Sequence, residues 1–359
     1  MSEMECLKIR LMVKSGFVTA QTRKLPAPPL GIIASIASGF ETVNARLELI
    51  LLPLALDLLL WLGPHLSVKP IVDQLLSQMT LALGSAAFDA ATMASFNAVH
   101  DMLAAYGERF NFFSRLSTLP LGLPSLMGGR GGLLAPGGTP VTWLVDNAPE
   151  YVLLFVSFSL LGLFLGALYF GGIAQQVRDA RLSWRLSLKQ VWGDWARLTA
   201  LTTVAFIVIA LLSLPLILLA ALLALIHPLL AGFAVSTVAL WLLVYLGFTL
   251  HGIVLQRRGL FAAMWDSLHL AHVSLSQTLT LYTAVIFIYV GLDWVWSLPA
   301  DDSWLLLIGL LGHAVVSTAL VAATFVFYRD RYRWWVEMRR MLPAPVRAGR
   351  GGANRSTRA

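Results

Sequence analysis

Asp57, Asp293 and His313 each interrupt a long run of apolar residues. An ionisable side chain in such a run costs free energy, so it usually pairs with another group or carries a function. At about 1.5 Å of helical rise per residue, each lies within about 15 Å of the end of its run that we place on the outer side. We therefore expect the three to line one polar site that responds to cations or protons. The alternative is that each acid reaches interfacial water and that His313 bonds to a neighbouring helix.

His269 and His272 form a second candidate group, three residues apart and close to Asp266. Two imidazoles at this spacing share a helix face and could bind one metal ion. The sequence places no third ligand beside them, so we favour a solvated helix face and expect no bound metal. Cys6 is the only cysteine, which excludes an intramolecular disulfide and a cysteine-based metal cluster.

Motifs that bind nucleotides or carry hydrolytic chemistry are missing from the sequence. There is no Walker A loop, no G-x-S-x-G turn, no H-E-x-x-H helix and no Rossmann fingerprint. We therefore expect no enzymatic activity and no cofactor.

The composition indicates which solvent surrounds the elements that position these residues. The chain has 359 residues, of which 58% are hydrophobic and 13% are charged, and its net charge is +7. A soluble domain usually has about a quarter of its residues charged. Half that fraction over this length indicates that much of the surface faces lipid, and the mean hydropathy of +0.75 agrees.

Six stretches are candidates to cross a bilayer, which takes about 20 apolar residues in a helix. A fifth and a sixth stretch are weaker than the other four, because they contain Asp293 and the pair Glu48 and Asp57, respectively. The sixth is kept because an odd number of spans would place the termini on opposite sides. The predicted spans are 47–64, 151–173, 198–226, 229–255, 278–299 and 303–328.

Lys and Arg gather on the segments that these spans place on one side of the membrane. Such an excess marks the cytoplasmic side of membrane proteins. Of the 26 basic residues, all but Lys69, Arg109, Arg115 and Arg130 fall on that side, and these four share the long loop 65–150. We therefore predict a multi-pass protein of the cell (inner) membrane with both termini in the cytoplasm.

An amphipathic stretch precedes the first, third and fifth spans, with apolar residues recurring at steps of three and four. Such helices lie in the membrane interface with the apolar face down; an ordinary helix packed on the bundle is the alternative reading. The predicted fold is thus all-α, a polytopic bundle of six spans in three hairpins, each preceded by a cytoplasmic interfacial helix. The stretches begin near Ile33, Trp184 and Phe261.

The predicted domain organisation follows from these spans. A flexible cytoplasmic segment, 1–30, precedes a membrane domain, 31–341, and a basic tail, 342–359, follows it. The outer loop 65–150 is a subdomain. Its first half is predicted to be helical, whereas the part rich in Gly and Pro, 119–140, is predicted to be a loop that caps the bundle or rests on the outer leaflet.

Two further groups of residues suggest contacts. Basic and aromatic residues follow the last span, a pattern that suits the head groups of anionic lipids at the inner face. Gly162 and Gly166 form a G-x-x-x-G on the second span, which favours close packing within the chain or between chains. The predicted lipid contacts are Arg329, Arg331, Arg333, Trp334 and Trp335.

Several short motifs along the chain carry a resemblance to known proteins. They are Gly39-Phe40, Leu52-Pro53-Leu54 with Asp57, Trp61-Leu62-Gly63-Pro64, Phe110-Asn111, Leu123-Pro124-Ser125 and Phe327-Tyr328-Arg329-Asp330-Arg331. By these motifs the chain resembles a family of uncharacterised bacterial six-helix membrane proteins. More remotely, it is similar to the membrane domain fused to some glycerophosphodiester phosphodiesterases. The resemblance implies a fold and a membrane location but no catalytic residues, and the phosphodiesterase domain is missing from this chain.

These patterns favour one class of function over another. We expect a non-enzymatic accessory or scaffold component of the cell envelope or of an export system, because the spans have few polar residues to line a wet pathway. Its expected partners are the bilayer and other membrane or envelope proteins, not nucleic acid. The alternative is a transporter or permease for a small or lipid-like solute, which would use Asp57, Asp293 and His313.

Overall fold

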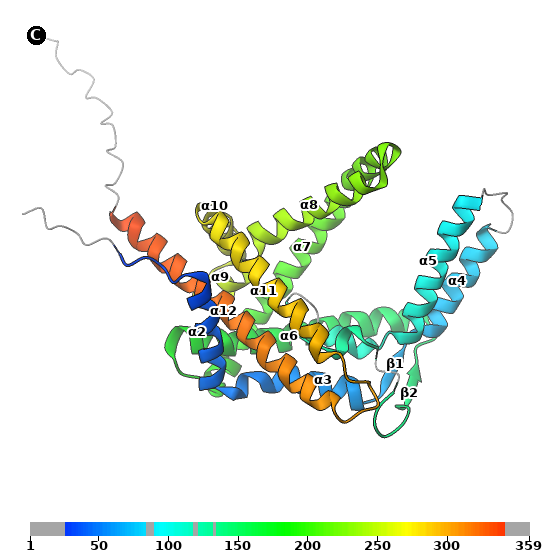
Figure 1. The fold of residues 1–359 in the computed structure, drawn as a ribbon, viewed down its shortest axis with the longest axis horizontal. Coiled ribbons are helices and arrows are strands. Elements are labelled where there is room, and N and C mark those ends of the chain that lie inside the picture. The colour runs from blue at the N-terminus through cyan, green and yellow to red at the C-terminus, as the bar shows by residue number, and fades with distance from the viewer. Residues whose placement is uncertain (1–25, 84–89, 118–120, 132–133, 342–359) are drawn as a thin grey trace, which may run out of the picture. The chain divides into compact units, whose positions relative to one another are not determined.

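The computed structural model describes residues 26–83, 90–117, 121–131 and 134–341 (Figure 1). The chain divides into two compact units, which we describe separately. One is Leu30–Arg329, and the other joins Met1–Pro29 with Asp330–Ala359. Most of the predicted N-terminal segment and the whole predicted tail, 342–359, lie outside the described residues.

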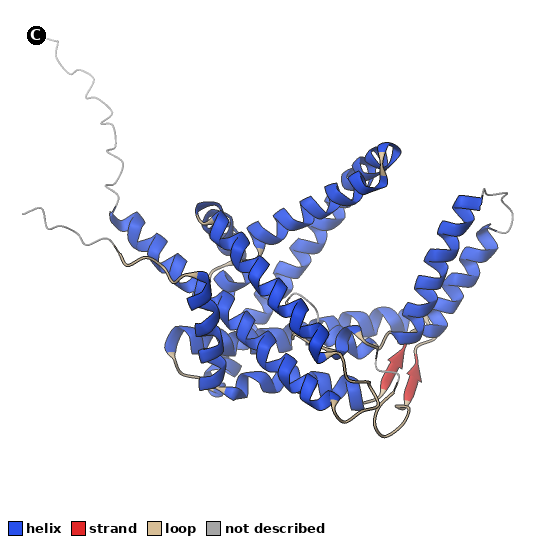
Figure 2. Ribbon diagram, in the orientation of Figure 1, coloured by secondary structure: helices blue, strands red, loops and turns tan. Residues whose placement is uncertain are grey.

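The described part of the chain is helical apart from one small sheet (Figure 2). The all-α prediction is therefore confirmed. Two short strands, β1 and β2, pair in parallel, with His65 opposite Thr142. The elements in chain order are α2 (Ile32–Ala45), η1 (Leu47–Ile50), α3 (Leu51–Leu62), β1 (His65–Ser67), α4 (Lys69–Leu83), α5 (Ala90–Arg109), η2 (Phe112–Leu116), η3 (Met127–Gly129), β2 (Thr142–Leu144), α6 (Ala148–Asp179), α7 (Trp184–Ile226), α8 (Pro228–Leu246), α9 (Thr249–Gln256), α10 (Leu260–Val273), α11 (Leu275–Trp296) and α12 (Leu306–Met341).

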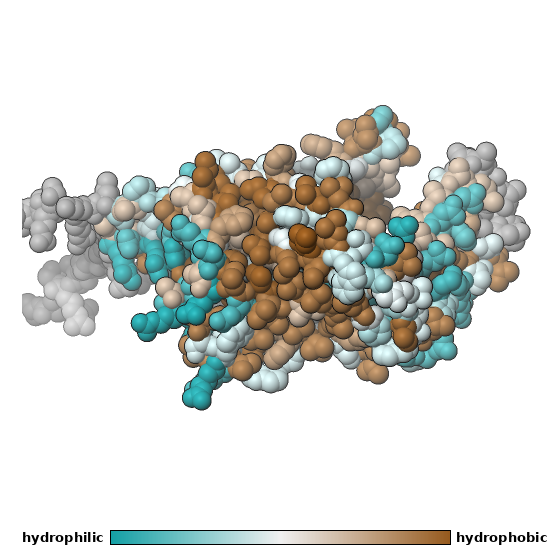
Figure 3. All heavy atoms as spheres, turned by 60° about the horizontal axis from the view of Figure 1, so that its bottom comes forward, coloured by the Kyte–Doolittle hydropathy of each residue, from teal (hydrophilic) through white to brown (hydrophobic). Residues whose placement is uncertain are grey.

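Five helical segments of the described chain are long and apolar enough to cross a membrane. They are α6, α7, α8 with α9, α11 and α12. Much of their surface is apolar and exposed: Phe206 and Leu225, for example, are 71% and 84% exposed. Figure 3 shows a broad hydrophobic area across one face of the molecule. These helices indicate a multi-pass membrane protein.

The prediction of six spans in three hairpins is wrong, because the first predicted span, 47–64, is not among these five. It forms the short turn η1 and then α3, a helix of 12 residues. At about 1.5 Å per residue, α3 is about 18 Å long, short of the ~30 Å hydrocarbon core. Leu56, Leu60 and Trp61 of α3 are buried against the protein.

The predicted interfacial stretches have different outcomes. The first and third correspond to separate helices, α2 and α10. The second is continuous with the following span in α7, which has 43 residues. At 1.5 Å per residue, α7 is about 65 Å long, roughly twice the thickness of the hydrocarbon core. No proline separates the two parts of α7, because its internal proline, Pro215, comes later.

Local sequence explains where the long helices begin and end. The Asn147 side chain accepts a hydrogen bond from the Glu150 amide at 2.8 Å, which caps the start of α6. Left-handed residues end α6 and α9: Ala180 and Arg257 both have φ of +53°. Between α8 and α9, Gly247 lies so close to the Tyr282 hydroxyl that no Cβ would fit. Helix α8 ends at Leu246, within the predicted span 229–255.

The predicted outer loop contains two structures. Helices α4 and α5 run side by side as a hairpin that extends from the sheet (Figure 1). The segment 121–131 is largely irregular, as predicted for the region rich in Gly and Pro. Its central part, from Gly122 to Met127, is buried in the protein. This segment therefore lies inside the helical unit. A loop that rested on the outer leaflet would not be buried in this way.

Candidate functional site

Asp57 lies in the middle of α3 and is fully buried. Its carboxylate accepts three hydrogen bonds from the irregular segment 121–131. Oδ1 accepts from the Ser125 hydroxyl at 2.5 Å and from the Met127 amide at 3.0 Å, and Oδ2 accepts from the Leu126 amide at 3.2 Å. The carboxylate thereby satisfies backbone amides of a segment whose only regular element is the short turn η3. Asp57 holds this segment against α3.

His313 on α12 lies beside Asp57 and is 2% exposed. Its Nδ1 is 3.7 Å from Oδ2 of Asp57. On the other side of the ring, Nε2 is 3.6 Å from Oδ1 of Asp293, which belongs to α11. The Tyr289 hydroxyl, also on α11, is 3.4 Å from the same Nε2. The structure therefore brings together the three residues that the sequence placed in one polar site.

Asp293 differs from its two neighbours in its access to solvent or head groups. Its side chain is 39% exposed, whereas Asp57 is fully buried. One carboxylate of the cluster is thus enclosed by protein and the other lies at its edge. A proton or small ion from outside the cluster would meet Asp293 before it reached Asp57.

A second set of contacts holds the same segment to the loop between α11 and α12. The Arg130 guanidinium donates to the carbonyls of Ser297 and Pro299, both at 3.0 Å, and lies 2.7 Å from the Asp301 carboxylate. Trp61 on α3 donates from Nε1 to the Asp301 carbonyl at 2.7 Å. Segment 121–131 is therefore bound at two places, around Ser125 and at Arg130.

The chemistry available to the cluster is proton transfer and charge pairing. A neutral imidazole has one N–H and one lone pair, whereas an imidazolium has two N–H groups. Because each ring nitrogen of His313 faces a carboxylate, only the imidazolium matches both Asp57 and Asp293. Nδ1 of His313 is buried and makes no hydrogen bond to the described residues. The geometry thus offers a place for one additional proton.

Metal binding has little support in the described part of the chain. No group of three or more His, Cys, Asp or Glu side chains there has the arrangement of a metal site. In the cluster around His313 the distances between ring nitrogens and carboxylate oxygens are 3.6 and 3.7 Å. These distances suit charge pairing between the ring and the two carboxylates.

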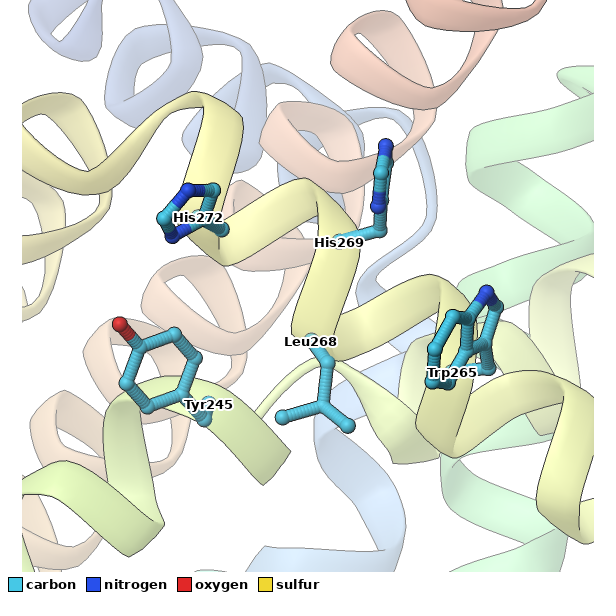
Figure 4. A pocket seen from close by; sticks show the side chains of 5 residues that line it. All are labelled: Tyr245, Trp265, Leu268, His269 and His272. Carbon is cyan, nitrogen blue, oxygen red and sulfur yellow. The ribbon is translucent and has the colours of Figure 1, made fainter.

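His269 and His272 line an open hollow of about 240 Å³ beside α10. Its other lining residues are Tyr245, Trp265 and Leu268. In Figure 4 the two imidazoles point away from each other, so they do not form a common pair of metal ligands. The outward face of α10 carries Phe261 and Trp265, which are 76% and 69% exposed.

The predicted lipid-contact residues are divided between the two units. Arg329 donates to the Val177 carbonyl of α6 at 2.6 Å, so at least one of its N–H groups is used inside its own unit. Arg331, Arg333, Trp334 and Trp335 belong to the part of α12 in the other unit. There the Arg339 guanidinium lies 4.7 Å from the centre of the Trp335 ring.

Gly166 on α6 allows a close approach within the chain, one of the two predicted alternatives, although its neighbour is not a helix. A Cβ at Gly166 would overlap the Leu121 carbonyl oxygen and lie 3.0 Å from Gly122 Cα. The neighbour of Gly166 is therefore the irregular segment 121–131 and not another helix. Gly162, one turn earlier, is buried as well.

Several residues of the site were missed from the sequence. Ser125, Arg130 and Tyr289 were not assigned to it, although each contacts a predicted member or holds the segment that does. The sequence contains a signal for Ser125. Its hydroxyl is a single polar side chain within an apolar run in the loop between spans. Arg130 and Tyr289 carry no local signal that would set them apart.

No protein-family model, curated protein or solved structure matches this chain.

Proposed function

We propose that this chain is a non-enzymatic accessory or scaffold component of the cell envelope, or of an export system, in the cell membrane. One observation carries the proposal. The α4–α5 hairpin exposes apolar side chains, although it is not among the helices apolar enough to span a membrane. Val99, Met102 and Tyr106 recur at steps of three and four on α5 and are 43%, 63% and 53% exposed. Such a row on a projecting helix suits the surface of another protein.

The charged groups around this hairpin support a protein partner over a lipid one. Lys69 at its base pairs with Asp73 at 3.2 Å and lies 3.9 Å from Glu108. Asp101 on α5 is 82% exposed. A carboxylate beside the apolar row disfavours immersion in hydrocarbon. The hairpin therefore suits a surface that is partly apolar and partly polar.

The proposed topology places the C-terminus and the loop between α9 and α10 in the cytoplasm and the region from β1 to β2 outside. The distribution of Lys and Arg supports this orientation. No crossing is proposed within 47–62, because that stretch is not among the five candidate spans of the described chain.

Kinship with the family that the chain resembles is also a proposal. It is supported by the position of the residues that carry the resemblance. Asp57 and Ser125 bond to each other, and Trp61 bonds to the α11–α12 loop. Asn111 accepts a hydrogen bond from the Leu66 amide at 3.1 Å. Contact with anionic lipids at the inner face is proposed for the basic and aromatic end of α12 on composition alone.

A transporter is the second candidate, favoured by the cluster of Asp57, His313 and Asp293. Buried ionisable residues on neighbouring helices are common along ion and proton pathways. Against it, Asp57 is bonded to three donors of the chain itself, which ties it to holding segment 121–131. We therefore rank transport below the scaffold role.

The scaffold role is tested by cross-linking in the native membrane. A photoreactive amino acid at Met102 is expected to capture one protein at a defined mass, and a Val99→Ser/Tyr106→Ser double variant is expected to reduce that capture about tenfold or more. Asn97, an exposed polar residue on another face of α5, provides the matched control as Asn97→Ser. Equal capture by the double variant, or solute movement by the pure protein in liposomes with no captured partner, would favour the transporter instead.

A further inference from the structure

We propose that Asp57, His313 and Asp293 form a proton-binding site that secures the buried segment 121–131. The ligand is a single proton, taken up by the His313 ring. The site couples three helices, α3, α11 and α12, to a segment with no regular structure through most of its length. This inference goes beyond the scaffold role and does not depend on it.

The first step is the match between charge states and geometry. His313 presents Nδ1 to Asp57 at 3.7 Å and Nε2 to Asp293 at 3.6 Å. With the proton bound, both nitrogens carry an N–H and both carboxylates have a positive neighbour within 4 Å. Without it, one carboxylate faces a lone pair. The protonated form therefore stabilises the contact among the three helices.

The second step links the proton to the buried segment. The carboxylate of Asp57 that faces His313 also accepts from the amides of Leu126 and Met127. An enclosed carboxylate with no nearby positive charge is costly even when it is hydrogen-bonded. Loss of the proton from His313 removes that positive charge, so the whole arrangement, including the bonds to segment 121–131, becomes less stable. The segment is held most firmly when the proton is bound.

The other titratable groups near the ring do not supply this response. Tyr289 on α11 approaches Nε2 with its hydroxyl. Tyr169 on α6 donates to Thr318, a residue five positions further along α12, at 3.1 Å. Arg130 and Asp301 pair with each other at the end of the α11–α12 loop. Among the described groups that contact the ring, Asp57 and Asp293 carry the charges.

Hydrogen exchange measured by mass spectrometry on the full chain in lipid nanodiscs tests the proposal. After correction for intrinsic exchange, protection of 121–131 is expected to fall about tenfold as the pH is raised from about 5 to about 8, the range in which histidine side chains commonly exchange protons. His313→Gln, which cannot take up the proton, is expected to show no such change. His251→Gln is the matched control, because His251 is also buried in a helix and bonds to Thr324 instead.

If His313→Gln fails to fold, a second variant, Asp293→Asn, still tests the proposal. Asp293 is partly exposed, so its replacement by an isosteric amide should be tolerated. Loss of the negative charge beside the His313 ring is expected to weaken proton uptake about threefold. The midpoint of the pH-dependent change in protection of 121–131 should therefore move to lower pH. If the midpoint of the pH-dependent change in protection is the same in Asp293→Asn as in the wild type, the proposal is overturned. It is also overturned if protection in His313→Gln keeps the wild-type pH dependence, or if this dependence is lost in His251→Gln.

Discussion

At the scale of single residues, the interior is organised around a few polar groups whose partners are distant in sequence. Asp57 bonds to residues 68 to 70 positions further along the chain. The sequence predicted that an acid in an apolar stretch needs partners, and it placed Asp293 and His313 with it. It did not identify the Leu126 and Met127 amides, because backbone donors in a loop leave no trace in residue type or periodicity.

Replacing Asp57 by Asn tests the role of its carboxylate. The amide nitrogen of Asn would turn a donor toward Ser125, Leu126 or Met127, each of which already donates. We expect a loss of about 2–4 kcal/mol in the free energy of unfolding, measured by titration of the purified protein with denaturing detergent. Ser125→Ala, which removes one of the three donors, is expected to cost less. Equal stability of Asp57→Asn and the wild type would contradict this role.

A different histidine gives the opposite response to pH. His65 in β1 bonds through Nε2 to the Phe110 carbonyl at 3.1 Å. Burial lowers the pKa of His65 below its ordinary value of 6.5, and the bond to Phe110 opposes this only in part. The unfolded chain therefore binds this proton more readily than the folded one. The contribution of His65 to stability is present above about pH 6.5 and is lost as the pH falls through the folded pKa.

We thus expect protection from hydrogen exchange at 65–67 and 110–113 to fall on acidification, while that of 121–131 rises. His65→Gln should abolish the first change and leave the second. If 65–67 lost protection at low pH to the same extent in His65→Gln, another group would be responsible.

At the scale of elements, the sequence predicted the positions of the apolar helices well and the residues at which they begin and end less well. The spans 151–173 and 303–328 lie within α6 and, apart from its first residues, α12. Residues 184–198 were predicted as a separate helix, yet they are part of α7, because amphipathic and apolar periods share the same helical repeat and no breaker separates them. The stretch 47–64 was predicted to be a span because of its apolar content. However, α3 is too short to cross the hydrocarbon core, and segment 121–131 packs against it.

The contact between α6 and that segment is tested by a pair of glycines on one helix. Gly166→Ala would push a methyl group into the Leu121 carbonyl, whereas nothing lies near a Cβ at Gly171. We expect Gly166→Ala to cost about 1–3 kcal/mol and Gly171→Ala to be neutral or stabilising by up to about 1 kcal/mol. Thermal unfolding in the same detergent compares the two variants. Similar midpoints for both would mean that segment 121–131 does not pack against α6.

At the scale of the whole chain, composition predicted the environment, and the charges predict the orientation. Low charge and long apolar runs sufficed to indicate a helical membrane protein, because these properties are averages over many residues. The depth at which 121–131 is buried could not be predicted in this way. It depends on a few tertiary contacts, such as Arg130 with the Ser297 carbonyl, between residues far apart in the chain.

Cysteine labelling tests the central claim, a helical chain threaded through a bilayer with β1 to β2 on the outer side. In a Cys6→Ala background, single cysteines replace Gly137 and Gly259, which are exposed and have open space where a side chain would go. Gly137 lies in the region before β2 that we propose to be outside, and Gly259 lies between α9 and α10.

A membrane-impermeant maleimide applied to intact spheroplasts should label the cysteine at 137 at once and the cysteine at 259 only after the membrane is permeabilised. Labelling of both positions before permeabilisation, or of neither, would contradict the account.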